Sequence, residues 1–130
     1  MEQYLIDTNA VSDYFSASFP IDGMLKMDAA IDAVPNISVI TQIELICWNT
    51  DKVTMQNVQN FITDSAILNI TPDVIVECVN LRNSKKIKTP DAIIAATALA
   101  YSFTLITNNE KDFSNIKGLK ILNLHNLQRS

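Results

Sequence analysis

Histidine and cysteine, the side chains that most often bind zinc or act in nucleophilic catalysis, are scarce in this chain. It has one histidine, His125, and two cysteines, Cys47 and Cys78, none of them at the spacing of metal ligands. We expect His125 to have a surface or packing role, and both cysteines to be small buried apolar side chains within helices. A zinc centre and a Ser-His or Cys-His triad are therefore not expected.

Glycine and long hydrophobic runs are also scarce. Only two of the 130 residues are glycine, 48% are hydrophobic, and every apolar run is far shorter than a membrane span. The opening residues Met-Glu-Gln-Tyr lack the basic and apolar segments of a signal peptide. These features predict a single folded domain over residues 1–130, located in the cytoplasm and not attached to a membrane.

Positive charge is not in excess either. The chain has 10 Lys and Arg against 14 Asp and Glu, which gives a net charge of −4. This balance argues against simple electrostatic attraction to nucleic acid or to an anionic membrane. A nucleic-acid substrate is still compatible with it if carboxylates hold divalent cations, because a bound metal ion reverses the local charge.

What the chain does have is a regular alternation of strand-like and helix-like segments. Strands are expected over residues 3–6, 37–40, 66–70, 104–107 and 120–124, and helices over 10–15, 21–33, 41–48, 51–63, 72–84 and 90–102. The alternation predicts an α/β sandwich with a mainly parallel sheet of roughly five strands.

The helix that follows Lys88 is the most distinctive segment. Thr89 is expected to cap it, Pro90 suits its first position, and Asp91 lies in its first turn, where the helix dipole favours negative charge. From Ala92 to Ala100 only Thr97 is polar, which predicts burial on nearly every side. A Thr-Pro-Asp sequence also starts the helix at 72–84, so the motif alone indicates only a helix start.

Acidic residues follow several of the expected strands. Asp7 follows the first strand, Glu44 comes soon after the second, and Asp112 lies in the polar loop, residues 108–113, after the fourth. Ligands of parallel α/β sheets bind beyond the carboxyl ends of the strands. If the helix carrying Asp91 starts at the same edge, the four carboxylates converge there, with Asn109 nearby.

Carboxylate and amide oxygens are the ligands of hard cations, so such a cluster predicts Mg²⁺, with Mn²⁺ as a second possibility. These ions activate water and stabilise the leaving oxygen of a phosphodiester without any help from histidine, lysine or serine. Metal-dependent phosphodiester hydrolysis is the reaction class that fits.

Each of these residues also has a simpler interpretation. Asp7 could only cap the first helix, and Thr41 with Glu44 could form a capping box. Thr8 and Thr107, with Asn9, could orient the carboxylates, although threonines at strand ends often serve local turns. Four further acids are assigned to the solvent-exposed surface: Asp13, Asp28, Asp32 and Asp64.

A basic segment precedes Asp91. It could guide an RNA backbone to the metal site or could be a solvated turn, and its members are Arg82, Lys85, Lys86 and Lys88.

In their order along the chain, the motifs Asp7-Thr-Asn9, Glu44, Pro90-Asp91-Ala-Ile-Ile-Ala-Ala-Thr97 and Leu105-Ile-Thr107-Asn-Asn-Glu-Lys-Asp112-Phe113 resemble those of PIN-domain ribonucleases, specifically the VapC-like toxins. The resemblance covers essentially the whole chain. It implies a PIN-like three-layer sandwich, with Asp7, Glu44 and Asp91 as the main metal ligands and Asp112 or Asn109 at a fourth position. Asn109 stands where many members of the family have an acid.

The resemblance further implies an endoribonuclease that acts as the toxin of a toxin–antitoxin pair, is held inactive by a cognate antitoxin, and forms homodimers. Two alternatives remain at this point. One is a catalytically weak or inactive protein of this fold that binds RNA or a peptide. The other is a phosphoacceptor receiver-like domain, which would need an acidic neighbour for Asp7 and a lysine after a late strand.

Overall fold

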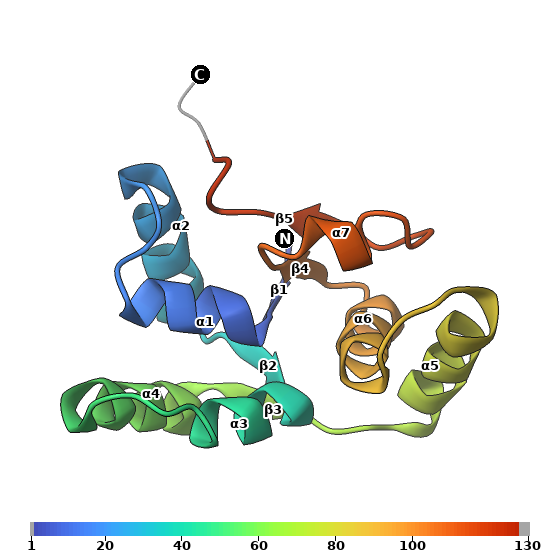
Figure 1. Cartoon of the computed structure of the whole chain (residues 1–130), viewed down its shortest axis with the longest axis horizontal. Helices are drawn as coiled ribbons and strands as arrows, with labels where there is room; N and C mark the ends of the chain where they lie inside the picture. The colour runs from blue at the N-terminus through green and yellow to red at the C-terminus, as the bar shows by residue number, and fades with distance from the viewer. Residues whose placement is uncertain (1, 128–130) are drawn as a thin grey trace.

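The computed structural model describes residues 2–127 and contains one five-stranded parallel sheet (Figure 1). The strands lie side by side in the order β3-β2-β1-β4-β5, so the first strand of the chain is the central one. Their bounds are β1 Tyr4–Ile6, β2 Asn36–Ser38, β3 Ala66–Leu68, β4 Thr104–Ile106 and β5 Ile121–Leu122. The α/β prediction with a parallel five-stranded sheet is confirmed.

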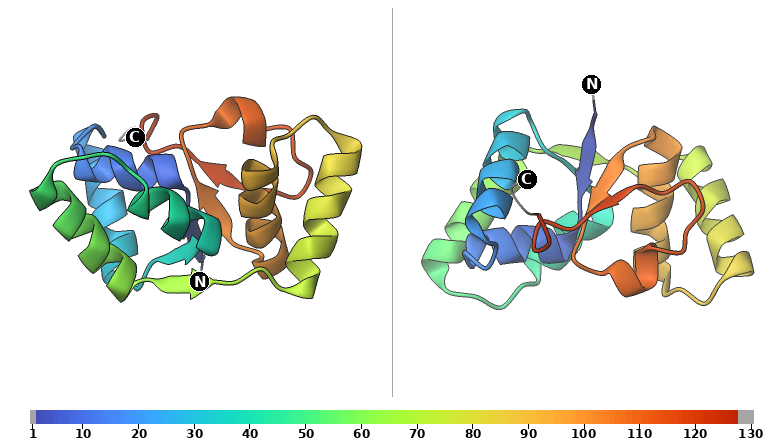
Figure 2. Two further views of the ribbon diagram at one scale, coloured as in Figure 1. Left: turned by 60° about the horizontal axis from the view of Figure 1, so that its bottom comes forward. Right: turned by 90° about the horizontal axis from the view of Figure 1, so that it is seen from above.

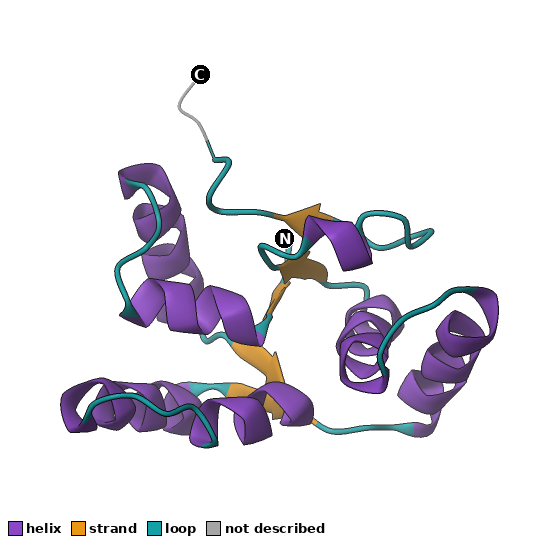
Figure 3. Cartoon of the chain, viewed as in Figure 1, coloured by secondary structure: helices purple, strands orange, loops and turns teal. Residues whose placement is uncertain are grey.

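Helices cover both faces of the sheet, which gives the three layers that the sequence motifs implied (Figure 3). In Figure 1, α1 and α2 lie on one side of the strands and α6 and α5 on the other. The helices are α1 Thr8–Phe15, α2 Ile21–Asp32, α3 Val39–Ile46, α4 Lys52–Asp64, α5 Pro72–Ser84, α6 Thr89–Tyr101 and α7 Glu110–Phe113. Figure 2 shows the same layers from two further directions.

Alternation along the two central strands builds a separate core on each face. Leu5 and Leu105 pack into the cluster on the α5 and α6 side, whereas Ile6 and Ile106 pack into the cluster formed with α1 to α4. These residues are paired across β1 and β4, Leu5 with Leu105 and Ile6 with Ile106. All four are completely buried, as expected for a parallel sheet covered on both sides.

Helix α6 is buried as the sequence predicts, but it starts one residue earlier than expected. Lys88 occupies the N-cap, because its carbonyl accepts the first helical hydrogen bond, from Ala92 N–H, at 2.8 Å. Thr89 is therefore the first helical residue and not the cap. The buried hydroxyl of Thr97 donates to the carbonyl of Ile93 at 2.7 Å, which satisfies the polar side chain inside the apolar stretch.

Three other expectations were wrong in detail. The second strand ends at Ser38 and not at residue 40, because the Ser38 hydroxyl accepts from Thr41 N–H and caps α3. The polar loop 108–113 contains the short helix α7, capped by Asn109. Cys47 is exposed at the end of α3, while Cys78 is partly buried. Between residues 2 and 127, none of the helices combines the length and apolarity needed to cross a bilayer.

Candidate functional site

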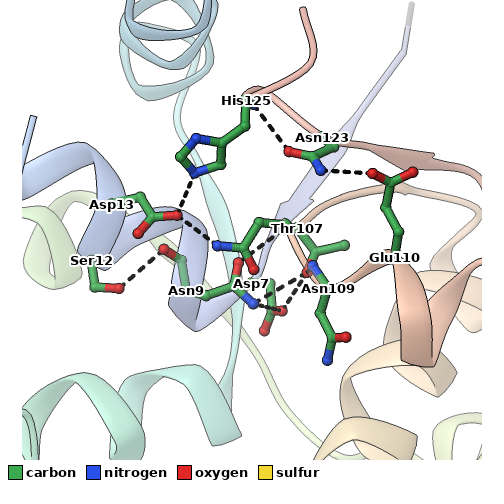
Figure 4. Close-up of polar contacts among 10 residues, drawn as sticks. Asp7, Asn9, Ser12, Asp13, Thr107, Asn109, Glu110, Asn123 and His125 are labelled. Carbon is green, nitrogen blue, oxygen red and sulfur yellow. Dashed lines mark hydrogen bonds and ion pairs between the residues drawn. The ribbon is translucent and has the colours of Figure 1, made fainter. Parts of the chain in front are cut away.

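Asp7 lies at the carboxyl end of the central strand, where the chain enters α1. Its carboxylate caps that helix by accepting from Thr8 N–H at 2.8 Å. The second oxygen, Oδ2, accepts from the Asn9 amide at 2.8 Å and from the Thr107 hydroxyl at 2.8 Å (Figure 4). Capping is thus part of its role, but two donors from outside the cap hold the other oxygen in place.

Burial makes the Asp7 carboxyl a weaker acid than an exposed aspartate. The side chain is 4% exposed, and this desolvation raises the pKa of Asp7 to about 6. The Thr107 and Thr8 hydrogen bonds oppose the rise, whereas the negative charges of Asp91 and Glu44 add to it. A carboxylate in this position is therefore stabilised by any cation that enters the site.

Thr107 follows β4 directly, and β4 is the neighbour of β1 in the sheet. Its buried hydroxyl donates to Asp7 and accepts from the backbone N–H of Asn109 at 3.0 Å. The Asn9 amide approaches the same hydroxyl at 3.3 Å. Thr107 and Asn9 therefore both hold Oδ2 of Asp7, and their supporting role in a metal site stays a prediction.

Glu44 lies within α3 and not in a capping box. The cap of α3 is Ser38, six residues earlier, so the capping-box interpretation with Thr41 was wrong. Instead, Glu44 Oε1 accepts from the Thr8 hydroxyl at 2.6 Å, and that hydroxyl also lies 3.1 Å from the hydroxyl of Thr41. Thr8 thus links Glu44 to Asp7 through its side chain and its backbone N–H.

Asp91 lies in the first turn of α6 and is partly buried. Desolvation raises its pKa, and the negative charges of Asp112 and Glu44 raise it further, while the ammonium of Lys88 opposes the rise. Asp7 thus interacts electrostatically with Asp91 and Glu44, and Asp91 interacts also with Glu44 and Asp112. Each of the four predicted acids therefore lies within reach of the charge of at least one of the others.

Asn109 and Asp112 form a local pair at the start of α7. The Asn109 amide nitrogen donates to Asp112 Oδ2 at 3.0 Å, and its amide oxygen accepts from Asp112 N–H at 3.3 Å. Asn109 therefore positions Asp112, and the negative charge of Asp112 raises the pKa of Asp91.

The side chains as they stand do not form a closed cage. Across residues 2–127, no group of three or more His, Cys, Asp or Glu side chains is arranged so that it could hold a metal ion directly. Mg²⁺ keeps several of its waters and uses only one or two carboxylates, so it does not need such a cage. The donor set consists of carboxylates and amides, and burial together with repulsion between the acids raises the pKa of two of the carboxyls. Such a set fits a hard divalent cation.

The basic segment is only partly near the site. Lys88 is close enough to lower the pKa of Asp91. Arg82 is occupied, because its guanidinium donates to the carbonyl of Ile87. Lys85 is partly buried and Lys86 is exposed.

The structure adds residues that sequence patterns did not indicate. Asp13, which was assigned to solvent, accepts from His125 Nε2 at 2.8 Å (Figure 4). It also accepts from the Asn108 amide at 2.7 Å. Asp28, also assigned to solvent, accepts a hydrogen bond from the Tyr14 hydroxyl. Only the position of Asp13, one helical turn after Asn9, could have suggested that it faces the same way.

Comparison with known proteins decides the family. The family model described as PIN domain matches residues 4–119. The chain belongs to the PIN domain family. The resemblance that the sequence motifs indicated is thereby confirmed, and the fold of this PIN domain agrees with it.

Solved structures similar to this PIN domain come from several bacteria. A chain of a toxin–antitoxin complex from Klebsiella pneumoniae is 33% identical, with a TM-score of 0.73 over 96% of this chain and all of the other. A chain of DNA-bound VapBC from Salmonella typhimurium is 21% identical, with a TM-score of 0.78 over 94% and 98% of the two chains. A chain of VapBC2 from Rickettsia felis bound to a DNA fragment from its promoter is 21% identical, with a TM-score of 0.75 over 92% of this chain and 96% of the other. A search of curated protein sequences finds no match.

Proposed function

We propose that this PIN domain is a metal-dependent endoribonuclease and the toxin of a toxin–antitoxin pair. The observation that carries the proposal is the mutual electrostatic coupling of the four acids beside the carboxyl ends of β1 and β4. In the strand order β3-β2-β1-β4-β5, the crevice between β1 and β4 is where parallel α/β sheets bind their ligands.

In this proposal Asp7, Glu44 and Asp91 hold Mg²⁺, or Mn²⁺, and Asp112 completes the site with support from Asn109. The bound ion supplies positive charge that stabilises the attacking and leaving oxygens of an in-line displacement at phosphorus. Thr107, Asn9 and Thr8 keep the carboxylate oxygens of Asp7 and Glu44 in fixed orientations. Hydrolysis of this kind leaves a 5′-phosphate and a 3′-hydroxyl.

RNA is the proposed substrate because the acids lie beside the carboxyl ends of the central strands and a lysine flanks them. Lys88 precedes Asp91 by three residues and interacts with its charge. Lys86 and Lys85 precede Lys88 in the sequence, and we propose them as contacts to further phosphates of the polymer. Arg82 is a weaker candidate, since its guanidinium already contacts the Ile87 carbonyl.

An antitoxin and a second copy of the chain are the proposed partners, and the cytoplasm is the proposed location. The Klebsiella pneumoniae relative comes from a toxin–antitoxin complex. Exposed apolar side chains on α5, namely Ile75, Val76 and Val79, are each more than half exposed, as are Ile43 and Ile46 on α3. Apolar residues gathered on helix surfaces in this way are suited to protein contacts.

The test is incubation of the purified, partner-free protein with total cellular RNA in Mg²⁺, in Mn²⁺ and with a chelator. Asp91→Asn is the test variant, and Asp73→Asn is its matched control, since Asp73 occupies the same Thr-Pro-Asp helix start in α5. We expect discrete fragments that need metal, persist with Asp73→Asn and vanish with Asp91→Asn.

Two results would contradict the proposal. Fragments that survive Asp91→Asn would show that another nuclease made them. The absence of cleavage by a protein that still binds metal would instead support a binding protein of the same fold.

A further inference from the structure

A second polar cluster lies beside the four acids and is not used in the mechanism above. Its centre is Asp13 Oδ2, which lies 2.7 Å from the Asn108 amide nitrogen and 2.8 Å from His125 Nε2. Because a carboxylate oxygen only accepts, both nitrogens donate to it. One oxygen atom thus joins α1, the turn between β4 and α7, and the segment after β5.

The cluster is connected to Asp7 by a short chain of hydrogen bonds. The backbone N–H of Asn108 donates to Asn9 Oδ1 at 3.0 Å. That contact fixes the orientation of the Asn9 amide, since its oxygen faces Asn108 and its nitrogen must then face Asp7 Oδ2, 2.8 Å away. The next residue, Asn109, donates its N–H to the Thr107 hydroxyl. The turn at 108–109 therefore sets both external donors to Asp7.

His125 is itself held from two sides. Its ring lies against Phe19, with 4.8 Å between the ring centroids, and its backbone N–H donates to Asn123 Oδ1 at 3.0 Å. The same segment also holds α7, because the amides of Asn123 and Asn126 donate to Glu110 Oε2 at 2.8 and 2.9 Å. The segment 123–126 thus restrains the turn at Asn108 and the helix that carries Asp112.

We propose that His125 and Asp13 are positioning residues for the metal site, acting through Asn108 on Asn9 and hence on Asp7. The proposal rests on the proposed metal-dependent function, but it concerns how the chain orders its own carboxylates. Loss of the His125 donor leaves Asp13 with one partner, loosens the turn at 108–109, and frees the Asn9 amide to rotate away from Asp7.

Two substitutions separate the hydrogen bond from the ring contact. His125→Phe keeps an aromatic ring against Phe19 and removes the donor, whereas His125→Gln keeps a donor and removes the ring. Mn²⁺ binding to the full chain, followed by electron paramagnetic resonance, is the first readout. We expect His125→Phe to weaken it about three- to tenfold, and His125→Gln to restore most of the loss. Loss of a direct partner of a metal ligand typically costs about 10- to 100-fold, and His125 reaches Asp7 only through intervening residues.

A control and a kinetic measurement accompany this. Tyr14→Phe removes another side-chain hydrogen bond of α1, the one to Asp28, and should leave Mn²⁺ binding unchanged. In RNA cleavage, His125→Phe should lower kcat and leave KM unchanged, because the substrate surface is intact. Asp13→Asn, which disturbs the acceptor itself, should resemble His125→Phe.

A readout that needs neither metal nor cleavage keeps this inference separate from the proposed function. Solvent exchange of the Asn9 side-chain NH₂, measured by NMR, should be faster in His125→Phe than in the unaltered protein or in Tyr14→Phe. An unchanged exchange rate would overturn the positioning role, whether or not the protein cuts RNA. Normal Mn²⁺ binding in His125→Phe together with weakened binding in His125→Gln would overturn it as well, because the ring contact and not the hydrogen bond would then be what matters.

Discussion

Thr107 donates its hydroxyl to Asp7 Oδ2 at 2.8 Å across 100 residues of sequence, and both side chains are almost completely buried. The contact joins the two central strands at their carboxyl ends. It also lowers the pKa of Asp7, so it keeps the carboxylate form accessible in a site where burial favours the neutral form.

Removal of that hydroxyl should be costly. We expect Thr107→Val to lower the free energy of unfolding at pH 7 by about 1 to 3 kcal/mol, because a buried acceptor loses a donor. Thr107→Ser should restore most of the loss. Thr104→Val, in the same strand, is the control: the Thr104 hydroxyl bonds to exposed Glu2, so a smaller change is expected. Urea unfolding measures all three, and equal losses at 104 and 107 would contradict the argument.

The raised pKa of Asp7 predicts how stability changes with pH in the metal-free protein. Folded Asp7 keeps its proton up to a pH of about 6, whereas the unfolded chain releases it near 4. The folded state therefore binds more protons in this window, and stability falls as pH rises through it. Because Asp7 is buried, the fall should be on the order of 2 to 3 kcal/mol between pH 4 and 7.

Chemical unfolding at several pH values, with and without Mg²⁺, tests this. The ion should reduce the fall, because it binds the ionised carboxylates. Asp7→Asn should remove most of the fall and leave the part due to Asp91, whose pKa is also raised, whereas Asp73→Asn should not change the profile. A profile that stays steep in Asp7→Asn would assign the titration to another group.

The link between Thr8 and Glu44 makes a different prediction. Glu44 is exposed, so Thr8→Val should change stability by less than about 1 kcal/mol. Because the Thr8 hydroxyl holds Glu44 Oε1, the same variant should weaken Mn²⁺ binding and slow RNA cleavage, and Thr8→Ser should retain both. Unchanged Mn²⁺ affinity in Thr8→Val would show that Glu44 needs no such support.

Gly23 in α2 is a site where a single methyl group should destabilise the fold. A Cβ there would lie 2.5 Å from the carbonyl oxygen of Leu124 and 3.1 Å from Cβ of Phe19. Gly→Ala within a helix normally raises stability by about 1 kcal/mol. Here we expect a loss of about 1 to 3 kcal/mol, because backbone has to move. Thermal unfolding gives the sign, and any gain in stability would refute the packing argument.

Most of the strands and helices, and the convergence of the four acids, could be predicted because they depend on local sequence patterns. Strand-end positions follow from short apolar runs, and a parallel sheet brings those ends to one edge, which is why Asp7 and Thr107 meet. The exact starts of α3 and α6 were missed because the caps, Ser38 and Lys88, are chosen by backbone hydrogen bonds that several neighbouring residues could have made.

The cluster around Asp13 could not be predicted. His125 and Asp13 are 112 residues apart, and neither belongs to a motif with a fixed spacing. An aspartate in an amphipathic helix is most often solvated, and only the path of the chain after β5 brings the imidazole to it. The hydrogen bond from the Arg82 guanidinium to the Ile87 carbonyl could not be predicted either, because it depends on how the turn before α6 folds.

The central position of β1 also affects when the site can exist during synthesis. β1 is made first, but one of its two neighbours, β4, is made about 100 residues later, and Asp112 follows β4. A nascent chain on the ribosome has Asp7 and Glu44 but lacks Thr107, Asp112 and the wall formed by α6. We therefore expect no harmful activity from incomplete chains, because the last third of the protein must emerge before the acids can be assembled.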